Sequence, residues 1–439
     1  MSSSVTLRQF WTVLSPEGRW LLSTVAVQTL GRGLTLPFTV IYLHEVRGFS
    51  LDLAGTLMAF IAVVALAVTG PGGALTDRVG ARRVLLFSTT CQLLGCTVLA
   101  FATTPAAAAL AMAFLGVNFG MSWPAFNALI AAVTTGELRQ QYFGINFALI
   151  NLGIGVGGVI GGMYADVSQP HTFTVIFLAD AASMLVPIAL LLGPLRRVSG
   201  QHVAPDDADA ASGSYLAILR NPAVVGMTGL TFIAVFVGYG QLEAGFPAFA
   251  RQVGDVSTRV IGFAFAVNTA VIVLLQFLVL RRIAGHRRTR VMLVMCAIWA
   301  VSYLVLGATG VLPGVLAGAA VLAYMGLFAL GETMMQPTIP AITNDMAPDH
   351  LRGRYNAVNA GAFQAGAIGG PLFAGFVLDR GWSTPYVLTM VVGCALIAVL
   401  ALVVERLVPA AVNGVPDESV LSIHTATGDP APQGTPERE

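Results

Sequence analysis

The chain has 439 residues, of which 56% are hydrophobic and only 10% are charged, and its formal net charge is +1. A soluble domain carries about 25% charged residues, so this composition excludes an ordinary soluble protein and favours one embedded in a bilayer. The four cysteines lie inside apolar runs, which is typical of small core residues and not of a disulfide set or a metal site. They are Cys91, Cys96, Cys296 and Cys394.

Twelve segments contain the roughly 20 predominantly apolar residues that a membrane-spanning helix needs. They cover residues 19–42, 51–73, 84–102, 106–130, 142–164, 172–193, 223–248, 259–280, 291–309, 314–338, 355–378 and 384–405. The first segment is too long for a signal-peptide core and carries Arg32, so we expect no cleavage. The pattern predicts an all-α integral membrane protein with 12 transmembrane helices.

The segments between the spans divide the chain into five parts. We expect a cytoplasmic N-terminus over 1–18, a six-helix bundle over 19–193, a polar linker over 194–222, a second six-helix bundle over 223–405, and a disordered tail over 406–439. The tail has no apolar periodicity, and its deletion should be tolerated.

The arginines predict the orientation of the chain. All 23 basic residues are arginines, and most of them fall on one side of the predicted membrane. Only Arg47, Arg251, Arg259 and Arg380 fall on the other side, and Arg32 lies within the membrane. Because cytoplasmic loops are enriched in arginine, we expect both termini in the cytoplasm and the protein in the inner (plasma) membrane.

The first span carries Arg32 between Gly31 and Gly33. A charged side chain inside the membrane is rare and usually faces a cavity or an acidic partner. Two interpretations stay open: a structural ion pair within the N-terminal half, or a cation of a substrate site or proton relay.

A dense polar loop follows the second span and reads Gly-Ala-Leu-Thr-Asp-Arg-Val-Gly-Ala-Arg-Arg over residues 73–83. It resembles the signature loop of the major facilitator superfamily, G-x-L-x-D-R-x-G-R-R-R, with Ala81 where that family usually has a basic residue. The residues that carry the resemblance are Gly73, Asp77, Arg78, Gly80, Arg82 and Arg83.

The resemblance implies that this loop acts as a gate. In the family, the carboxylate at Asp77 meets the N-terminal end of the span over 355–378, where free N–H groups favour an anion. Glu137 is then a plausible partner for Arg82 and Arg83. The alternative is that these arginines are ordinary cytoplasmic loop charges.

Of two further spans, one departs from the family's pattern and the other resembles it. Many proton-coupled members have an arginine where this chain has Met112, and Arg32 is a candidate replacement. The span over 142–164 resembles the family's antiporter motif G-x-x-x-G-P-x-x-G-G, in which small residues let helices approach closely. Ordinary helix packing is the alternative. The glycines concerned are Gly153, Gly157, Gly158, Gly161 and Gly162, with Gly158 in the place of proline.

The two halves are related by an internal repeat. Pro124, Tyr142 and Gly162 recur as Pro337, Tyr355 and Gly375 at an offset of 213 residues. The second copy of the glycine motif contains Gly366, Gly370, Pro371 and Gly375. Parallel halves related by an axis along the membrane normal are the architecture of this family, so the repeat supports the resemblance independently of the loop.

Three acids lie within the predicted spans: Asp180, Glu243 and Glu332. A low dielectric disfavours the charged form of a carboxyl group, so an acid in a cavity that opens alternately to each side can carry a proton across. Glu332 is the first candidate for this role, by resemblance to exporters with a glutamate in the corresponding span, and Glu243 is the second. For Asp180, a local hydrogen bond is the favoured interpretation, and both glutamates could instead be structural.

Other polar residues in the spans are candidates for lining a cavity. They are Asn118, Tyr239, Gln241, Gln276, Gln336, Asn359 and Gln364.

No motif of an enzyme or an ATP-driven pump is present: the chain has no phosphate-binding Gly-Lys-Ser/Thr loop, no metal-ligand spacing of histidines and no nucleophile elbow. We therefore expect no cofactor and no metal, with a proton gradient as the energy source. The expected partners are a small-molecule substrate and the lipid bilayer, without nucleic acid, and the expected state is a monomer.

The resemblance implies a drug:proton antiporter that exports small amphipathic or cationic compounds. The main alternative is a symporter or uniporter that imports a sugar, an amino acid or another metabolite. A non-transporting sensor would need a signalling domain, and a membrane-embedded transferase would need clustered aspartates, neither of which the sequence contains.

Overall fold

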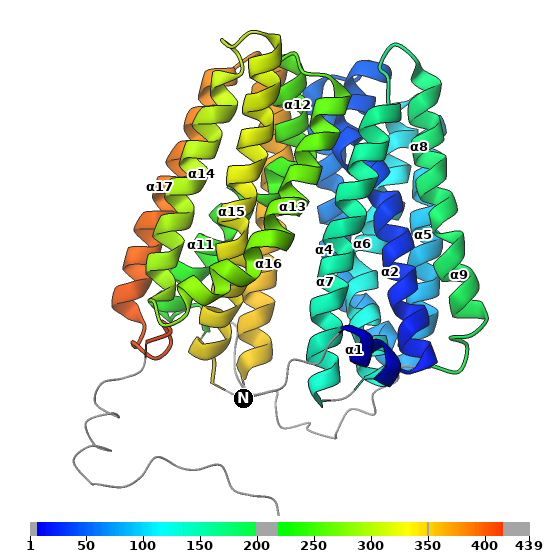
Figure 1. Ribbon diagram of the computed structural model, residues 1–439, viewed down its shortest axis with the longest axis vertical. Coiled ribbons are helices and arrows are strands. Elements are labelled where there is room, and N and C mark those ends of the chain that lie inside the picture. Colours follow the sequence, from blue (N-terminus) through cyan, green and yellow to red (C-terminus); the bar gives the residue numbers. More distant parts are fainter. Residues whose placement is uncertain (1–6, 135, 199–217, 349–350, 416–439) are drawn as a thin grey trace, which may run out of the picture.

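The computed structural model describes residues 7–134, 136–198, 218–348 and 351–415, and these ranges fold into helices joined by short connections (Figure 1). The first half contains α1 (Leu7–Val13), α2 (Pro16–Thr35), η1 (Leu36–Phe38), α3 (Thr39–Ile41), η2 (Tyr42–Val46), α4 (Leu51–Val79), α5 (Ala81–Phe101), α6 (Pro105–Val133), α7 (Gly136–Tyr164), α8 (Pro170–Ser183) and α9 (Leu185–Leu192). The second half contains α11 (Pro222–Val237), η4 (Gln241–Gly245), α12 (Phe246–Gln252), α13 (Thr258–Ile283), α14 (Arg288–Ala308), α15 (Gly314–Met346), α16 (Arg352–Asp379) and α17 (Ser383–Leu407).

Eleven helical segments of the described chain are long and apolar enough to cross a membrane. They correspond to the predicted spans from 51–73 onward. The remaining predicted span, 19–42, is α2 continued through η1, α3 and η2. It is less uniformly apolar because it contains Arg19 and Arg32, and its helix is interrupted next to Pro37. The prediction of an all-α membrane protein is confirmed.

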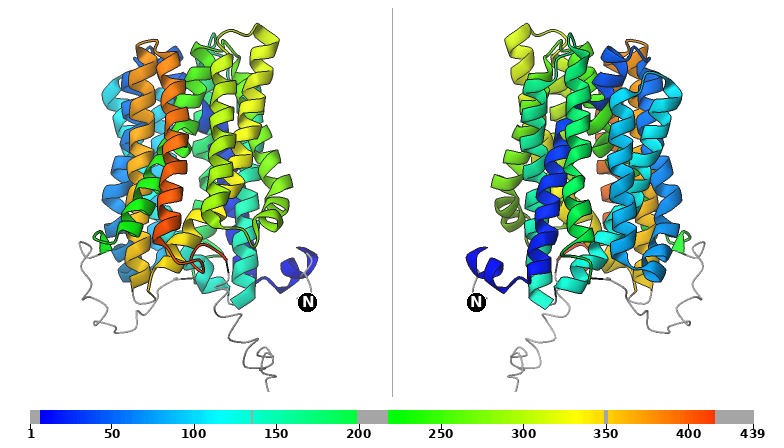
Figure 2. Two further views of the ribbon diagram at one scale, coloured as in Figure 1. Left: turned by 90° about the vertical axis from the view of Figure 1, so that its left-hand side faces the viewer. Right: turned by 90° about the vertical axis from the view of Figure 1, so that its right-hand side faces the viewer.

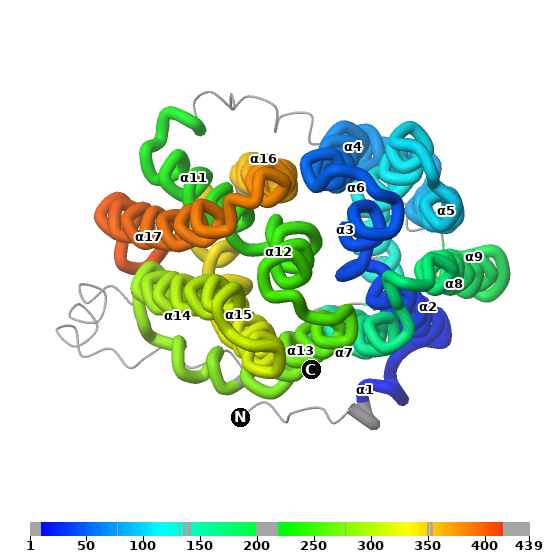
Figure 3. Tube along the Cα trace, turned by 90° about the horizontal axis from the view of Figure 1, so that it is seen from above, coloured from blue at the N-terminus to red at the C-terminus, as the bar shows by residue number. Residues whose placement is uncertain are grey.

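The helices form two bundles that lie side by side. Seen from above, α2 to α9 make up one bundle and α11 to α17 the other, with α4 next to α16 and α7 next to α13 (Figure 3). The side views show the helices running along the long axis, with α1 at one end (Figure 2). We call this end, where α2 begins and α17 finishes, the terminal face, and the opposite end, which carries η2 and α12, the far face (Figure 1).

The two bundles are in close contact near the far face. A Cβ added to Gly55 of α4 would lie 2.3 Å from the carbonyl oxygen of Pro371 on α16, and one added to Gly262 of α13 would lie 2.4 Å from the carbonyl oxygen of Gly158 on α7. Closer to the terminal face on α4 and α7, a Cβ added to Gly70 or Gly144 would meet no atom within 4 Å. The backbones therefore seal the far face.

Polar contacts reinforce this seal. The Asp379 carboxylate at the end of α16 accepts a hydrogen bond from the Leu51 N–H at 2.8 Å, which satisfies an otherwise free donor in the first turn of α4. Arg251 of α12 forms an ion pair with Glu45 of η2 at 2.5 Å. Both contacts join the halves, so they must break if the far face opens.

At the terminal face, the loop that carries the family signature is a tight turn between α4 and α5. Gly80 adopts φ +92°, a conformation that favours glycine. Arg82 donates to the Leu191 carbonyl oxygen at 2.8 Å, at the end of α9. The side chains of Asp77 and Glu137 lie outside the described part of the chain, so the predicted contacts of the gate stay predictions.

The start of the expected disordered tail is folded. Residues 408–415 follow α17 and return to α14, where Asn413 is buried. The Asn413 Oδ1 accepts from the Thr289 N–H at 3.0 Å, while the residue before α14, Arg287, makes no side-chain cap. A residue that follows α17 thus caps α14, and residues 408–415 pack against the second half. The part of the tail from residue 416 on lies outside the described residues.

Truncating the chain after Leu407 should therefore lower stability, while truncation after Val415 should not. Loss of the Asn413 cap is expected to cost about 1 kcal/mol. Thermal unfolding of the purified protein in detergent measures both variants. Equal melting temperatures for the two truncations would contradict a capping role for Asn413.

Candidate functional site: a cavity between the halves

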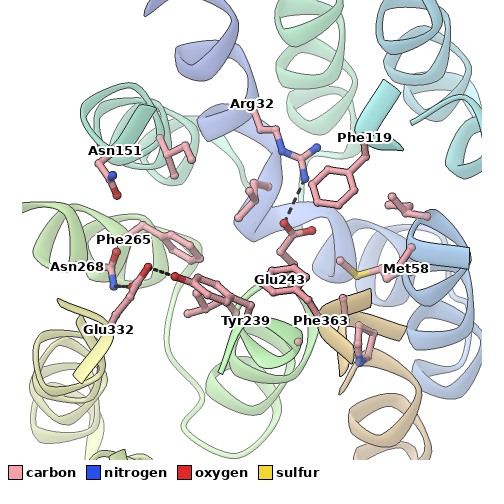
Figure 4. Close-up of a pocket in the computed structure, with 18 of the residues that line it drawn as sticks. Arg32, Met58, Phe119, Asn151, Tyr239, Glu243, Phe265, Asn268, Glu332 and Phe363 are labelled. Carbon is pink, nitrogen blue, oxygen red and sulfur yellow. Dashed lines mark hydrogen bonds and ion pairs between the residues drawn. The ribbon is translucent and has the colours of Figure 1, made fainter. Parts of the chain in front are cut away.

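A central cavity of about 290 Å³ lies between the two bundles (Figure 4). Its lining residues come from both halves: Arg32, Leu36, Met58, Ile61, Ala62, Phe119, Asn151, Ile154, Tyr239, Gly240, Leu242, Glu243, Phe265, Asn268, Thr269, Glu332, Phe363, Ala367 and Pro371. Most are apolar or aromatic, with a few converging polar groups, which is typical of a small-molecule site.

Two interrupted helices place charged groups at this cavity. α2 ends at Thr35, just after Arg32, and α11 ends at Val237, before the wide turn η4 that contains Glu243. The two breaks occur in the first spanning helix of each half. Discontinuous helices are a common way to build a binding site at mid-membrane depth.

Arg32 and Glu243 form an ion pair across the interface between the halves. Arg32 Nη2 lies 3.2 Å from Glu243 Oε1 (Figure 4). One interpretation of Arg32 is a structural ion pair within the N-terminal half. The contact with Glu243 does not fit that interpretation, because Glu243 belongs to the other half. The pair instead joins the two halves at the cavity wall.

Asp180 lies deeper in the first half and is only 1% exposed. Its Oδ2 accepts hydrogen bonds from Thr35 at 2.8 Å and from the Cys96 thiol at 3.3 Å. Asp180 and Arg32 both line a small void of about 20 Å³, so the carboxylate adds negative charge behind the arginine. These contacts match the local hydrogen bonding expected for Asp180.

Replacing Arg32 with methionine should leave two acids without their cation. We expect a loss of about 1–3 kcal/mol of stability, less than for a fully buried pair because both partners are partly exposed to the cavity. The double variant Arg32→Met/Glu243→Gln should recover most of that loss. Thermal unfolding of the four proteins as a double-mutant cycle measures the coupling, and additive effects would contradict it.

Glu332 occupies the opposite wall of the cavity and has neutral partners. Tyr239 donates to its Oε1 at 2.7 Å, and Asn268 donates to its Oε2 at 3.4 Å (Figure 4). Gln336 in turn donates to the Tyr239 hydroxyl. None of the ion pairs found in the described part of the chain involves Glu332. This acid can therefore be neutral, or can face a cation supplied by a ligand.

Several polar residues predicted to line the cavity are used elsewhere. Gln241 is fully buried and links the end of α11 to α17, donating to the Phe236 carbonyl oxygen and accepting from Tyr386. Asn359 accepts from Thr231, and Gln276 donates to the Thr333 carbonyl oxygen. These three residues and Gln364 are not among the residues that line the central cavity. Buried polar groups must be paired, and helix packing meets that need here.

The glycine motifs serve two kinds of contact. Gly153, Gly157 and Gly161 pack on α2 within the first half, whereas Gly158 and Gly162 face Gly262 of α13 in the second half. In the second copy, Gly366 and Gly370 pack on the chain around α11, while Gly375 faces Gly55 across the interface. Sequence alone could not separate the two groups, because both faces of a helix use the same small residues.

The sequence does not reveal the aromatic lining of the cavity, because Phe119, Phe265 and Phe363 lie in apolar runs where nothing distinguishes a cavity from a core. Asn151 was missed for a related reason: it lies beside the glycine motif, and the motif explained the segment without it. No group of three or more histidine, cysteine or acidic residues within reach of a common metal ion occurs among the described residues.

Two similar helical bundles around a shared cavity are the architecture of a membrane transporter that works by alternating access. The Major Facilitator Superfamily model matches residues 21–328 and 255–430, and the chain belongs to this family. It is accordingly a multi-pass membrane transporter and not an enzyme.

The alignments with relatives span most of both chains. The chain is 25% identical over 372 residues to the uncharacterized MFS-type transporter YttB of Bacillus subtilis, covering 83% of this chain and 89% of YttB. It is 23% identical over 381 residues to the quinolone resistance protein NorA of Staphylococcus aureus, covering 86% and 93%. Among solved structures, a POT family transporter in complex with a thioalcohol-conjugated peptide has a TM-score of 0.75 at 12% identity, covering 89% of this chain and 96% of that one, which supports the fold.

Proposed function

We propose that the protein exports small amphipathic or cationic compounds in exchange for protons. The observation that carries the proposal is the position of Glu332, an acid at the wall of the central cavity whose hydrogen-bond partners, Tyr239 and Asn268, are neutral. A proton and a cationic substrate can compete for such a carboxylate. Their alternation gives antiport.

The distribution of arginines favours a cytoplasmic terminal face in the plasma membrane. With the far face sealed, the structure then corresponds to a state that takes up substrate from the cytoplasm. Opening of the far face must break the contacts Arg251–Glu45 and Asp379–Leu51, after which a proton from outside displaces the substrate from Glu332. The similarity to NorA, a quinolone resistance protein, supports export.

Inverted membrane vesicles with an acid interior test the proposal. A pH-sensitive dye reports the gradient while a lipophilic cation, a neutral antibiotic or a sugar is added. We expect a cation to dissipate part of the gradient in vesicles that contain the protein, and not in vesicles without it. The variant Asp52→Asn, which removes an acid at the start of α4 outside the cavity, should behave as wild type.

The competing function, import with protons, predicts the opposite sign. In that case a substrate added outside the vesicles would not release interior protons, and the sugar would move only when the outside is acid. No response to any cation, with import of a metabolite, would overturn the proposal.

A further inference from the structure

A second cavity, of about 260 Å³, lies within the first half and meets the central cavity at Arg32, Phe119 and Ile154, which line both. We call it the side compartment. Its other lining residues are Val25, Gln28, Thr29, Leu85, Gln92, Asn118, Ser122, Trp123, Phe126, Asn146, Ile150 and Met184. Beyond the junction at Arg32 these side chains are uncharged, so this space suits a neutral part of a ligand.

The side compartment offers hydrogen-bond acceptors, which favour a ligand that carries hydrogen-bond donors. The Asn118 amide nitrogen donates to the Ser88 carbonyl oxygen at 2.9 Å and to the Ser122 hydroxyl at 2.8 Å, which leaves its Oδ1 as an acceptor. Asn146 is only 2% exposed, and its Oδ1 has no hydrogen-bond partner. A buried acceptor without a partner is costly, and a ligand that supplies an N–H or O–H group removes that cost.

The walls of the side compartment are aromatic. Phe119 and Trp123 are 47% and 55% exposed, and Phe126 completes the group. Aromatic side chains hold a planar ring by stacking or edge contacts. The compartment therefore combines ring surfaces with free acceptors, whereas the central cavity supplies the acid Glu332.

We propose that the side compartment binds an aromatic group bearing N–H or O–H donors, so that the preferred substrates are aromatic cations with such donors. This inference rests on the proposed function for the cationic part of the substrate and adds the chemistry of its other part.

Two aromatic cations separate this inference from general affinity for lipophilic cations. Ethidium carries two aryl amino groups, and tetraphenylphosphonium carries no hydrogen-bond donor. Equilibrium binding to the full chain in lipid nanodiscs should show that Asn118→Leu weakens ethidium about fivefold to tenfold, as expected for one lost hydrogen bond, and changes tetraphenylphosphonium by less than about twofold. Gln276→Leu, which removes an amide that lines neither cavity, is the matched control and should leave both affinities unchanged.

Equal weakening of both cations by Asn118→Leu, or no weakening of either, would overturn the inference. If that variant does not fold, Trp123→Phe provides a positional readout. Ethidium should quench the tryptophan emission of this variant less than that of wild type, and unchanged quenching would also overturn the inference.

Binding needs no gradient, so the two proposals can fail separately. Ethidium discrimination without proton exchange would leave the side compartment established and remove the proposed function. Proton exchange without discrimination between ethidium and tetraphenylphosphonium would support the proposed function and remove the proposed role of the side compartment.

Discussion

Replacing Glu332 with glutamine is expected to abolish proton-coupled transport and leave the cavity intact. Glutamine has the size of glutamate and can still pair with Tyr239 and Asn268, but it cannot take up and release a proton. We expect the substrate-driven proton flux to fall by at least about 100-fold, the scale on which removal of a proton-transfer group acts.

The control for this prediction is exchange without a net proton movement. Glu332→Gln should still catalyse counterflow of a substrate whose binding does not need a negative charge at residue 332. The thermal stability of this variant should stay close to that of wild type. Full pH-driven transport by Glu332→Gln would remove Glu332 as the carrier and leave Glu243 as the remaining acid at the cavity.

Replacing Gly55 with alanine should prevent the far face from sealing. The added Cβ would lie 2.3 Å from the Pro371 carbonyl oxygen and 3.0 Å from Gly375 Cα, and neither backbone atom can move alone. Such overpacking costs about 1–3 kcal/mol, which corresponds to about a fivefold to 150-fold smaller population of the sealed state. We expect transport to fall by a comparable factor, although alanine favours the helix itself.

Gly70→Ala is the matched control on the same helix, because a Cβ there meets no atom within 4 Å. A cysteine introduced at Met58, at the central cavity, reports the state of the seal. Its labelling by an impermeant maleimide from the far face should accelerate in Gly55→Ala and not in Gly70→Ala. Identical labelling in both variants would contradict the role of this contact.

The fold follows from the sequence because its signals are local and repeated. Apolar runs of membrane length predict the helices, and the recurrence of Gly162 as Gly375 predicts two similar halves. The first span is the exception. Arg32 and Pro37 interrupt its apolar, helical character, and this interruption is where the site is built.

The site is less predictable because its contacts join distant helices. Glu332, Glu243 and Arg32 can be selected from the sequence because they are charges within predicted spans. The pairing of Arg32 with Glu243, and not with an acid of its own half, depends on how the two bundles pack together. Gln241 is a candidate cavity residue by its position in the sequence. In the structure it is fully buried and accepts a hydrogen bond from Tyr386. Helix rotation decides both cases, and periodicity fixes it only loosely in spans that are apolar on every side.

The most direct test of the central claim is the direction of substrate movement in proteoliposomes that contain only the purified protein. With an acid interior, we predict that ethidium added outside accumulates inside, that an ionophore which collapses the pH gradient stops this accumulation, and that Glu332→Gln lacks it. Ethidium uptake that requires an acid exterior, or that proceeds at the same rate without a gradient, would contradict proton antiport.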